Sequence, residues 1–408
     1  MKKSDLKRYA ELLVKTGVHL QKGQELIVNA SVEQKDLALE VVSEAYKAGA
    51  KKVTLEWSAQ EEKRLRYRYQ SEETLSGLEN WEIERLKFHA ETLPARLYIE
   101  SDDPDGLAGV DQKKVARANR KRYPFIKPFE DAMDNRYQWC IAGAAGEKWA
   151  KKVFPDLPKK QAVDALWKAI FQTARMEGNA MENWKQHNET LSSKAAYLNS
   201  LHLKELHYRA ANGTDLKVGL IDRGIFIGGA EKTLGSGIVF NPNIPSEEIF
   251  TSPKKGCAEG VGYASKPLSY RGELIENFSF VFKEGKVVEV HAEKGEELLK
   301  EMIAMDEAAG YLGEAALIPY DSPINDTGLL FYSTLYDENA SCHLALGDGF
   351  SNCIRDYEKY TPEEIKEMGI NDSMIHTDFM IGTRDLSIVG VTEDGREIPI
   401  FTEGNWAF

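Results

Sequence analysis

Residues 25–57, ELIVNASVEQKDLALEVVSEAYKAGAKKVTLEW, decide the fold of the first half of the chain. Residues 25–29 and 53–57 are short apolar runs typical of buried strands. Ser31 and Gln34 form a capping-box pattern, which predicts that a helix begins here and lies between the two strands. The helix face is given by apolar residues at helical spacing, namely Leu37, Ala38, Val41, Val42 and Ala45. A strand, a helix and a second strand in this order indicate a parallel pair with a crossover helix.

The same alternation continues outward from this unit. Residues 96–99 and 139–142 are further strand-like runs, and charged helical segments separate them. A long polar helical region, roughly residues 159–201, follows. We therefore expect the first half to be an α/β domain with a partly parallel sheet and helices on its faces.

From about residue 205 the sequence pattern changes, and strand and turn signals replace the alternation of strands and helices. Turn dipeptides sit between β-prone runs at Asn212-Gly213, Glu284-Gly285 and Asp394-Gly395, and each predicts a hairpin. We therefore predict an α/β fold class overall, with an N-terminal α/β domain at residues 1–200. Residues 201–408 are expected to form an α+β domain rich in antiparallel strands.

Length, charge and cysteine content exclude several classes of protein. The 408 residues exceed one ordinary hydrophobic core, in line with two domains. No stretch approaches the roughly 18 consecutive apolar residues of a membrane helix, and the N-terminal MKKSDLKRYAELLVKTG lacks the apolar core of an export signal. A net charge of −13 opposes binding to nucleic acid. Four cysteines without a CxxC pair suit a reducing cytoplasm and disfavour a thiolate zinc site.

Four short stretches of the second half place carboxylates and histidines in apolar or glycine-rich surroundings. They are NIPSEEIFT (residues 243–251), LGEAALIP (312–319), DENASCH (337–343) and IHTDFMIG (375–382). Oxygen ligands mixed with imidazole suit zinc, cobalt, manganese or a similar divalent ion. Carboxylates held close together repel one another, and two divalent cations would neutralise that charge.

Each stretch also has a purely structural interpretation. Glu247 and Glu248 fit the first turn of a helix capped by Ser246, and Glu338 fits a turn. Glu314 fits a solvated surface and His343 a core histidine. His376 and Asp378 are the strongest pair, because the period of two in a strand aims both side chains one way, although such a pair can also be structural. Spacing alone leaves these alternatives open.

The four stretches resemble the thermophilic-type metallo-aminopeptidases, the aminopeptidase T, AmpS and PepS group called peptidase family M29. The resemblance rests on NIPSEEIFTSP, LGEAALIP, LFYSTLYDENASCHLALG and HTDFMIG, in that order, and less specifically on YAELLVKTGVHLQKGQELIV near the N-terminus. It implies six ligands for two divalent metal ions per chain (zinc, cobalt, manganese or magnesium). These are Glu248, Glu314, Glu338, His343, His376 and Asp378.

The family resemblance also implies the activity. We expect a metal-activated water to remove N-terminal residues from peptides that have a free amine, with Glu314 or Glu338 as the general base. A homodimer is expected as well. The alternatives are an amidohydrolase or dipeptidase acting on another small amide, and a homologue that binds metal or peptide without catalysis.

One position departs from the family pattern. The family often has a tyrosine seven residues after the histidine of DENASCH, and here that position is Phe350. A phenyl ring cannot donate a hydrogen bond to a developing oxyanion. The other six histidines, in polar or helical contexts, are interpreted as surface or capping residues; they are His19, His89, His187, His202, His207 and His291.

Overall fold

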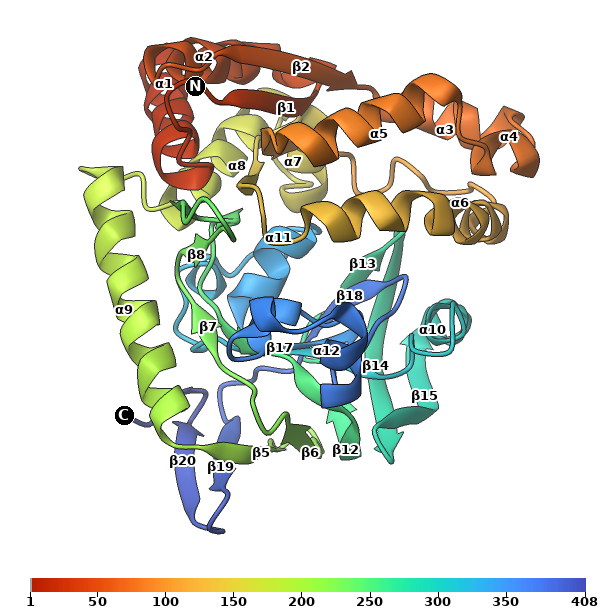
Figure 1. The fold of residues 1–408 in the computed structure, drawn as a ribbon, viewed down its shortest axis with the longest axis vertical. Helices are drawn as coiled ribbons and strands as arrows, with labels where there is room; N and C mark the ends of the chain where they lie inside the picture. Colours follow the sequence, from red (N-terminus) through yellow and green to blue (C-terminus); the bar gives the residue numbers. More distant parts are fainter. Residues whose placement is uncertain (1) are drawn as a thin grey trace. The chain divides into compact units, whose positions relative to one another are not determined.

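The computed structural model describes residues 2–408, which form two compact units (Figure 1). The first unit comprises the residues up to Gln186 together with Ala230–Pro245. The second comprises His187–Gly229 and Ser246–Phe408. The mixed α/β fold class is confirmed, whereas a division at residue 200 remains our proposal for the domain boundary.

The first unit is built on a five-stranded sheet in which every pairing is parallel. Its strands, in spatial order, are β10 (Asn243–Ile244), β4 (Trp139–Gly143), β3 (Ala95–Glu100), β1 (Glu25–Ser31) and β2 (Lys52–Ser58). The four strands expected from the first half of the sequence are confirmed. The two-residue β10 was not expected, and it adds a strand from beyond residue 240 to the edge of this sheet.

Helices flank this sheet. They are α1 (Lys3–Leu12), α2 (Lys35–Lys47), α3 (Gln60–Tyr69), α4 (Glu72–Ser76), α5 (Asn80–Thr92), α6 (Gln112–Met133), α7 (Glu147–Val153) and α8 (Lys159–Thr173). A π-helical turn, Leu13–Gly17, extends α1. Gly17 is required there, since a Cβ atom would lie 2.9 Å from Cys140 Sγ. Ser31 accepts a hydrogen bond from Glu33 N and so begins a short 3-10 turn before α2.

The larger sheet of the second unit has nine strands. They are β5 (Leu203–Arg209), β6 (Asp215–Leu220), β12 (Pro253–Tyr263), β13 (Leu268–Tyr270), β14 (Glu273–Lys283), β15 (Lys286–Lys294), β19 (Ser387–Thr392), β20 (Glu397–Thr402) and β21 (Asn405–Trp406). The three predicted hairpins are confirmed as β5–β6, β14–β15 and β19–β20. Glu284 (φ 50°) and Gly285 (φ 78°) both have the positive φ that a two-residue type I′ turn needs.

The smaller sheet of the second unit has five strands and positions the candidate site. In spatial order they are β18 (His376–Met380), β17 (His343–Gly347), β16 (Leu312–Leu317), β11 (Ile249–Thr251) and β7 (Ile227–Gly228), all antiparallel. One face is apolar and joins the core of this unit; Phe379 packs edge-on against Phe280 of β14, with ring centroids 4.9 Å apart. The strands of this sheet are almost entirely buried, so polar side chains on its other face need partners.

The remaining elements are short, apart from one long helix. They are α9 (Ala180–Ser200), α10 (Glu296–Ile303), α11 (Thr334–Asp337), α12 (Pro362–Met368) and the two-residue strands β8 (Glu231–Lys232) and β9 (Val239–Phe240). Across residues 2–408, none of the helices has both the length and the apolar character that crossing a membrane requires.

Candidate metal centre

All six predicted site residues lie in the second unit. Glu248 directly precedes β11, Glu314 lies in β16, Glu338 begins a 3-10 turn (Glu338–Ala340), His343 begins β17, and His376 and Asp378 lie in β18. Four of them therefore lie in adjacent strands of one sheet, a fifth directly precedes the next strand, and the sixth lies in the turn before β17.

The register of the sheet puts these side chains on one face. Glu314, Ala345 and Asp378 pair directly across three adjacent strands, so they form one row. His343 and His376 lie two residues from that row in their own strands, which keeps them on the same face. The small Ala345 side chain separates two carboxylates whose backbones are two strand spacings apart, roughly 10 Å. Its size leaves room for both carboxylates to lean together.

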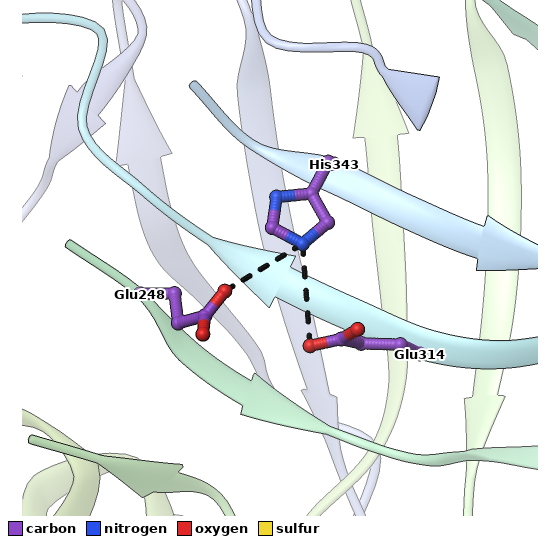
Figure 2. Close-up of side chains that lie close together, drawn as sticks. All are labelled: Glu248, Glu314 and His343. Carbon is purple, nitrogen blue, oxygen red and sulfur yellow. Dashed lines mark ion pairs between the residues drawn. The ribbon is translucent and has the colours of Figure 1, made fainter. Parts of the chain in front are cut away.

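The side chains converge into two overlapping groups of three, and Glu314 belongs to both. Figure 2 shows the first group, in which His343 Nε2 lies 3.7 Å from Glu248 Oε2 and 4.0 Å from Glu314 Oε1. In the second group, His376 Nε2 lies 3.1 Å from Glu314 Oε2 and 3.3 Å from Asp378 Oδ1. Within each group the ligand atoms lie within 4.8 Å of one another. That separation matches donors arranged around a single ion.

Both histidines are oriented through their other ring nitrogen. His343 Nδ1 lies 2.8 Å from the carbonyl oxygen of Glu338, and His376 Nδ1 lies 2.8 Å from that of Asp348. A carbonyl can only accept, so Nδ1 carries the proton in each ring. The Nε2 atoms therefore face the carboxylates, as is usual when histidine binds a metal.

The electrostatics of the cluster are dominated by buried negative charge. Burial, followed by the charges of Asp378, Glu248 and Glu314, raises the pKa of Glu338 well above its ordinary value. Burial also opposes ionisation of Asp378, but His376 outweighs it and lowers the pKa of Asp378 to about 2. Four carboxylates outnumber two imidazoles even when both rings are protonated. A bound divalent cation would relieve this imbalance, as would protonation of Glu338.

The structural interpretations of single motifs are wrong for two of these residues, Glu248 and Glu314. Residues 247 and 248 precede a strand and do not begin a helix. The Glu314 side chain is 5% exposed and therefore does not lie on a solvated surface. His343 is buried, as the core-histidine interpretation predicted, and its Nε2 also lies 3.7 Å from Glu248 Oε2 and 3.8 Å from Asp378 Oδ1. Glu338 does lie in a turn, as that alternative predicted, and it belongs to neither group of three although its carboxyl group is hydrogen-bonded to Asp378.

Asn339 is a buried supporting residue that sequence reasoning missed. Its Oδ1 accepts a hydrogen bond of 2.8 Å from Glu247 N, next to Glu248. Its Nδ2 donates to Leu335 O (3.1 Å) and to the carboxylate of Glu338 (3.3 Å). One amide thus joins the backbone beside one predicted ligand to the side chain of another. The sequence signal for Asn339 is its place beside Glu338, in a stretch that also fits a turn.

His187 is more buried than the interpretation of the remaining histidines as surface or capping residues predicts. Its side chain is only 10% exposed, and its Nε2 lies 2.7 Å from Ser246 O and 3.8 Å from Glu247 Oε2. It therefore contacts the two residues that precede Glu248. His187 and Ser246 are 59 positions apart in the chain, so no local pattern predicts this contact.

Phe350 lies beside the cluster, as its position after DENASCH led us to expect. Its ring centroid is 5.0 Å from that of His376 and 5.3 Å from that of Phe250. Its backbone N donates to Ser252 Oγ at 2.8 Å. The ring is therefore held next to the partly exposed histidine, where a tyrosine at this position would bring a hydroxyl group near the site.

Comparison with known proteins gives a consistent result. The family model described as thermophilic metalloprotease (M29) matches residues 2–406. Aminopeptidase AmpS of Bacillus subtilis (strain 168) is 41% identical over 405 residues, which cover 99% of this chain and 98% of that protein. Aminopeptidase T of Thermus thermophilus is 39% identical over 406 residues, with the same coverage.

Solved structures agree with the sequence relatives. Wild-type AmpT from Thermus thermophilus superposes with a TM-score of 0.90 at 38% identity, and the match covers 100% of both chains. The 2,5-dihydroxypyridine dioxygenase of Pseudomonas putida KT2440 matches with a TM-score of 0.52 at 12% identity over 100% of this chain and 98% of that one. The second likeness concerns the fold alone.

Proposed function

This chain belongs to the thermophilic metalloprotease family M29, and from that premise we propose that it is a metal-dependent aminopeptidase. Its substrates would be peptides with a free N-terminus, since relatives named aminopeptidases match almost its whole length. Membership of a metalloprotease family implies divalent metal as the cofactor. The number of ions and the residues that hold them are the finer part of the proposal.

The observation that carries this finer part is the pair of three-residue groups that share Glu314. We assign one ion to Glu248, Glu314 and His343, and a second to Glu314, His376 and Asp378. Glu338 would complete the set from beside Asp378. Zinc, cobalt, manganese or magnesium would supply Lewis-acid polarisation of the scissile carbonyl and a lowered pKa for the attacking water. The mixed oxygen and nitrogen donors fit such ions.

The chain's own residues would then position the substrate and move a proton. Glu314 and Glu338 are the candidate general bases. Glu314 belongs to both groups of three, and a carboxylate shared by two ions has little freedom to accept a proton. Glu338 lies outside both groups of three, so even as a sixth ligand it would be less constrained than the shared Glu314, which favours Glu338 as the proton acceptor.

Removal and restoration of metal tests the activity directly. Exhaustive chelation should abolish hydrolysis of leucine-4-nitroanilide, and zinc or cobalt should restore it. N-acetylation of the substrate should prevent turnover, because an exopeptidase of this kind requires the free amine. Turnover that survives chelation contradicts the proposal. Hydrolysis of the acetylated amide would favour a general amidohydrolase, and two bound ions without turnover of any free-amine peptide would favour a non-catalytic binding protein.

We further propose a homodimer in the cytoplasm. Large apolar side chains are exposed on the first unit, and a partner would cover them; they are Trp57, Leu65, Tyr69, Trp81, Phe88 and Phe125. All four cysteines are free thiols, as a reducing compartment would keep them. Light scattering on the protein and on a Trp81→Ser/Phe125→Ser variant tests the dimer. A monomeric parent protein would contradict it.

A further inference from the structure

The ring of His376 is oriented by a backbone oxygen outside its own strand. Its Nδ1 donates to Asp348 O at 2.8 Å, and Asp348 directly follows β17. Gly313 makes room for this oxygen, because a Cβ atom at that position would lie 2.0 Å from it. The carbonyl of Asp348 therefore has a closely defined place, and that place decides where Nε2 of His376 points.

The loop that carries this oxygen is tied to the segment that leads into β18. Asp348 N donates to Ile375 O at 2.6 Å. The carboxylate of Asp348 accepts a hydrogen bond from Ser373 N at 3.1 Å. Residues 373–375 therefore fix the loop after β17, and they also lead directly into His376, where β18 begins.

Asp306, in the loop between α10 and β16, holds this segment. One of its carboxylate oxygens, Oδ2, accepts from Ser373 Oγ at 2.8 Å and from Met374 N at 2.7 Å. The other, Oδ1, accepts from Ala308 N at 2.8 Å and lies 3.1 Å from Ser373 Oγ. Hydrogen bonds to an ionised acceptor are roughly twice as strong as those between neutral groups. The carboxylate thus joins its own loop to the segment that precedes His376.

Asp306 is not itself a candidate ligand. It belongs to neither group of three, and both of its oxygens are taken by N–H and O–H donors. Its path to the centre has two further hydrogen-bonded steps, from Ser373 N to the Asp348 carboxylate and from His376 Nδ1 to Asp348 O. A change at Asp306 would therefore displace the acceptor that orients the His376 ring while every predicted ligand stays in the chain.

We propose that Asp306 is a positioning residue for the metal centre and acts through Asp348 O on His376. This inference rests on the proposed function, since it concerns the ion assigned to Glu314, His376 and Asp378. The ion assigned to the other group of three should not depend on Asp306, because His343 is oriented by a different carbonyl, that of Glu338.

The isosteric substitution Asp306→Asn tests this role. An amide has one acceptor oxygen, so its NH₂ group would face either Met374 N or Ala308 N, donor against donor. The metal-free protein is titrated with Co²⁺ in competition with a chromophoric chelator, and the visible d–d bands of the bound ion are recorded. The dissociation constant of one ion should rise roughly 10- to 100-fold, and the d–d bands of that ion should change, while the other ion binds as before.

A second variant covers the case in which the Asp306→Asn protein does not fold. Ser373→Ala removes one donor to Asp306 and leaves the carboxylate in place. It should weaken the same ion by a smaller factor, about 2- to 10-fold, as expected for a single hydrogen bond. Urea unfolding of each metal-free variant shows whether it is folded.

Two comparisons separate positioning from general stability. Asp385→Asn is the matched control, because Asp385 also accepts from a backbone amide, Ala211 N (2.6 Å), and from a hydroxyl, Thr383 Oγ1 (2.8 Å), but belongs to neither group of three. It should keep both dissociation constants and the spectrum. A His376→Ala protein retains the first group of three, and adding Asp306→Asn to it should change the remaining dissociation constant by no more than about twofold.

Three results would overturn the inference. Asp306→Asn and Ser373→Ala could both bind the two ions as the parent does, Asp385→Asn could lose the same affinity, or Asp306→Asn could weaken the ion that remains in the His376→Ala protein as strongly as it weakens the parent. Each of these leaves the proposed function standing, since the parent still binds metal. A parent protein that binds no Co²⁺ would overturn the proposed metal centre and this inference together.

Discussion

Replacing Asn339 with alanine should weaken metal binding as well as the fold. The substitution removes the acceptor for Glu247 N and the donors to Leu335 O and Glu338. Two of these hydrogen bonds are between neutral groups and one is to a carboxylate, so the free energy of unfolding should fall by about 2–6 kcal/mol. The metal dissociation constant should rise roughly 10- to 100-fold, the usual effect of losing a residue that orients metal ligands.

The two effects are measured separately and compared with a control. Urea unfolding of the metal-free protein gives the stability, and competition with a chromophoric chelator gives the dissociation constant. Asn199→Ala is the matched control, because Asn199 also makes two side-chain hydrogen bonds to the backbone of this unit, to Phe226 O (2.9 Å) and from Phe226 N (2.7 Å). It should lose stability and keep metal affinity.

The reasoning is refuted if Asn339→Ala and Asn199→Ala lose similar stability and neither changes the dissociation constant. Asn339 would then be an ordinary buried amide. A loss of metal affinity confined to Asn339→Ala would instead show that its amide fixes the predicted ligands on either side of it.

Four further outcomes are expected. Ala345→Leu should put a bulky side chain between Glu314 and Asp378 and so prevent stoichiometric metal loading at a cost of only about 1–3 kcal/mol in stability; metal analysis and circular dichroism check this. Metal binding should release protons near neutral pH. Desolvation lowers the pKa of His376, but Asp378 and Glu314 outweigh it and raise that pKa well above its ordinary value. A metal binds only the neutral ring, so metal affinity should rise with pH, and calorimetry in buffers of different ionisation enthalpy measures the proton release. Phe350→Tyr should raise kcat about tenfold or more by adding a donor near His376, with unchanged metal content; an unchanged kcat would show that the hydroxyl is dispensable. Metal at about 100 times its dissociation constant should stabilise the protein by about 2.7 kcal/mol, so chelation should lower the melting temperature, and an unchanged melting temperature would argue against a bound metal.

The regular elements could be predicted where the local pattern is strong. Residues 25–57 contain both strands of the first parallel pair and the helix between them, and the three hairpin turns were identified by their turn residues. β10 could not be predicted in this way, since two residues carry no period. Its place in the sheet depends on pairing with β4, about one hundred residues earlier in the chain.

The candidate ligands were accessible to sequence reasoning because charged and imidazole side chains are unusual within apolar runs. The residues that shape the space around them were not accessible. Ala345 is one of many small buried residues, and its role follows only from pairing with Glu314 on one side and Asp378 on the other. His187 lies in α9 and contacts Ser246, which is 59 positions later in the chain. Both roles depend on register and tertiary contact, which no local pattern records.

The sheet that gathers the ligands also explains why the site should be rigid. Glu314, His343, His376 and Asp378 lie on adjacent strands whose other face packs into an aromatic core, with Phe379 against Phe280. None of these four can move away from its neighbours without breaking strand pairing or core contacts. The mutual repulsion of the clustered carboxylates therefore cannot be relieved by rearrangement of these strands. It can be relieved only by protons, as the raised pKa of Glu338 indicates, or by divalent cations. A rigid cluster of this kind favours an ion that fits it, so we expect the fold itself to contribute to the affinity for metal.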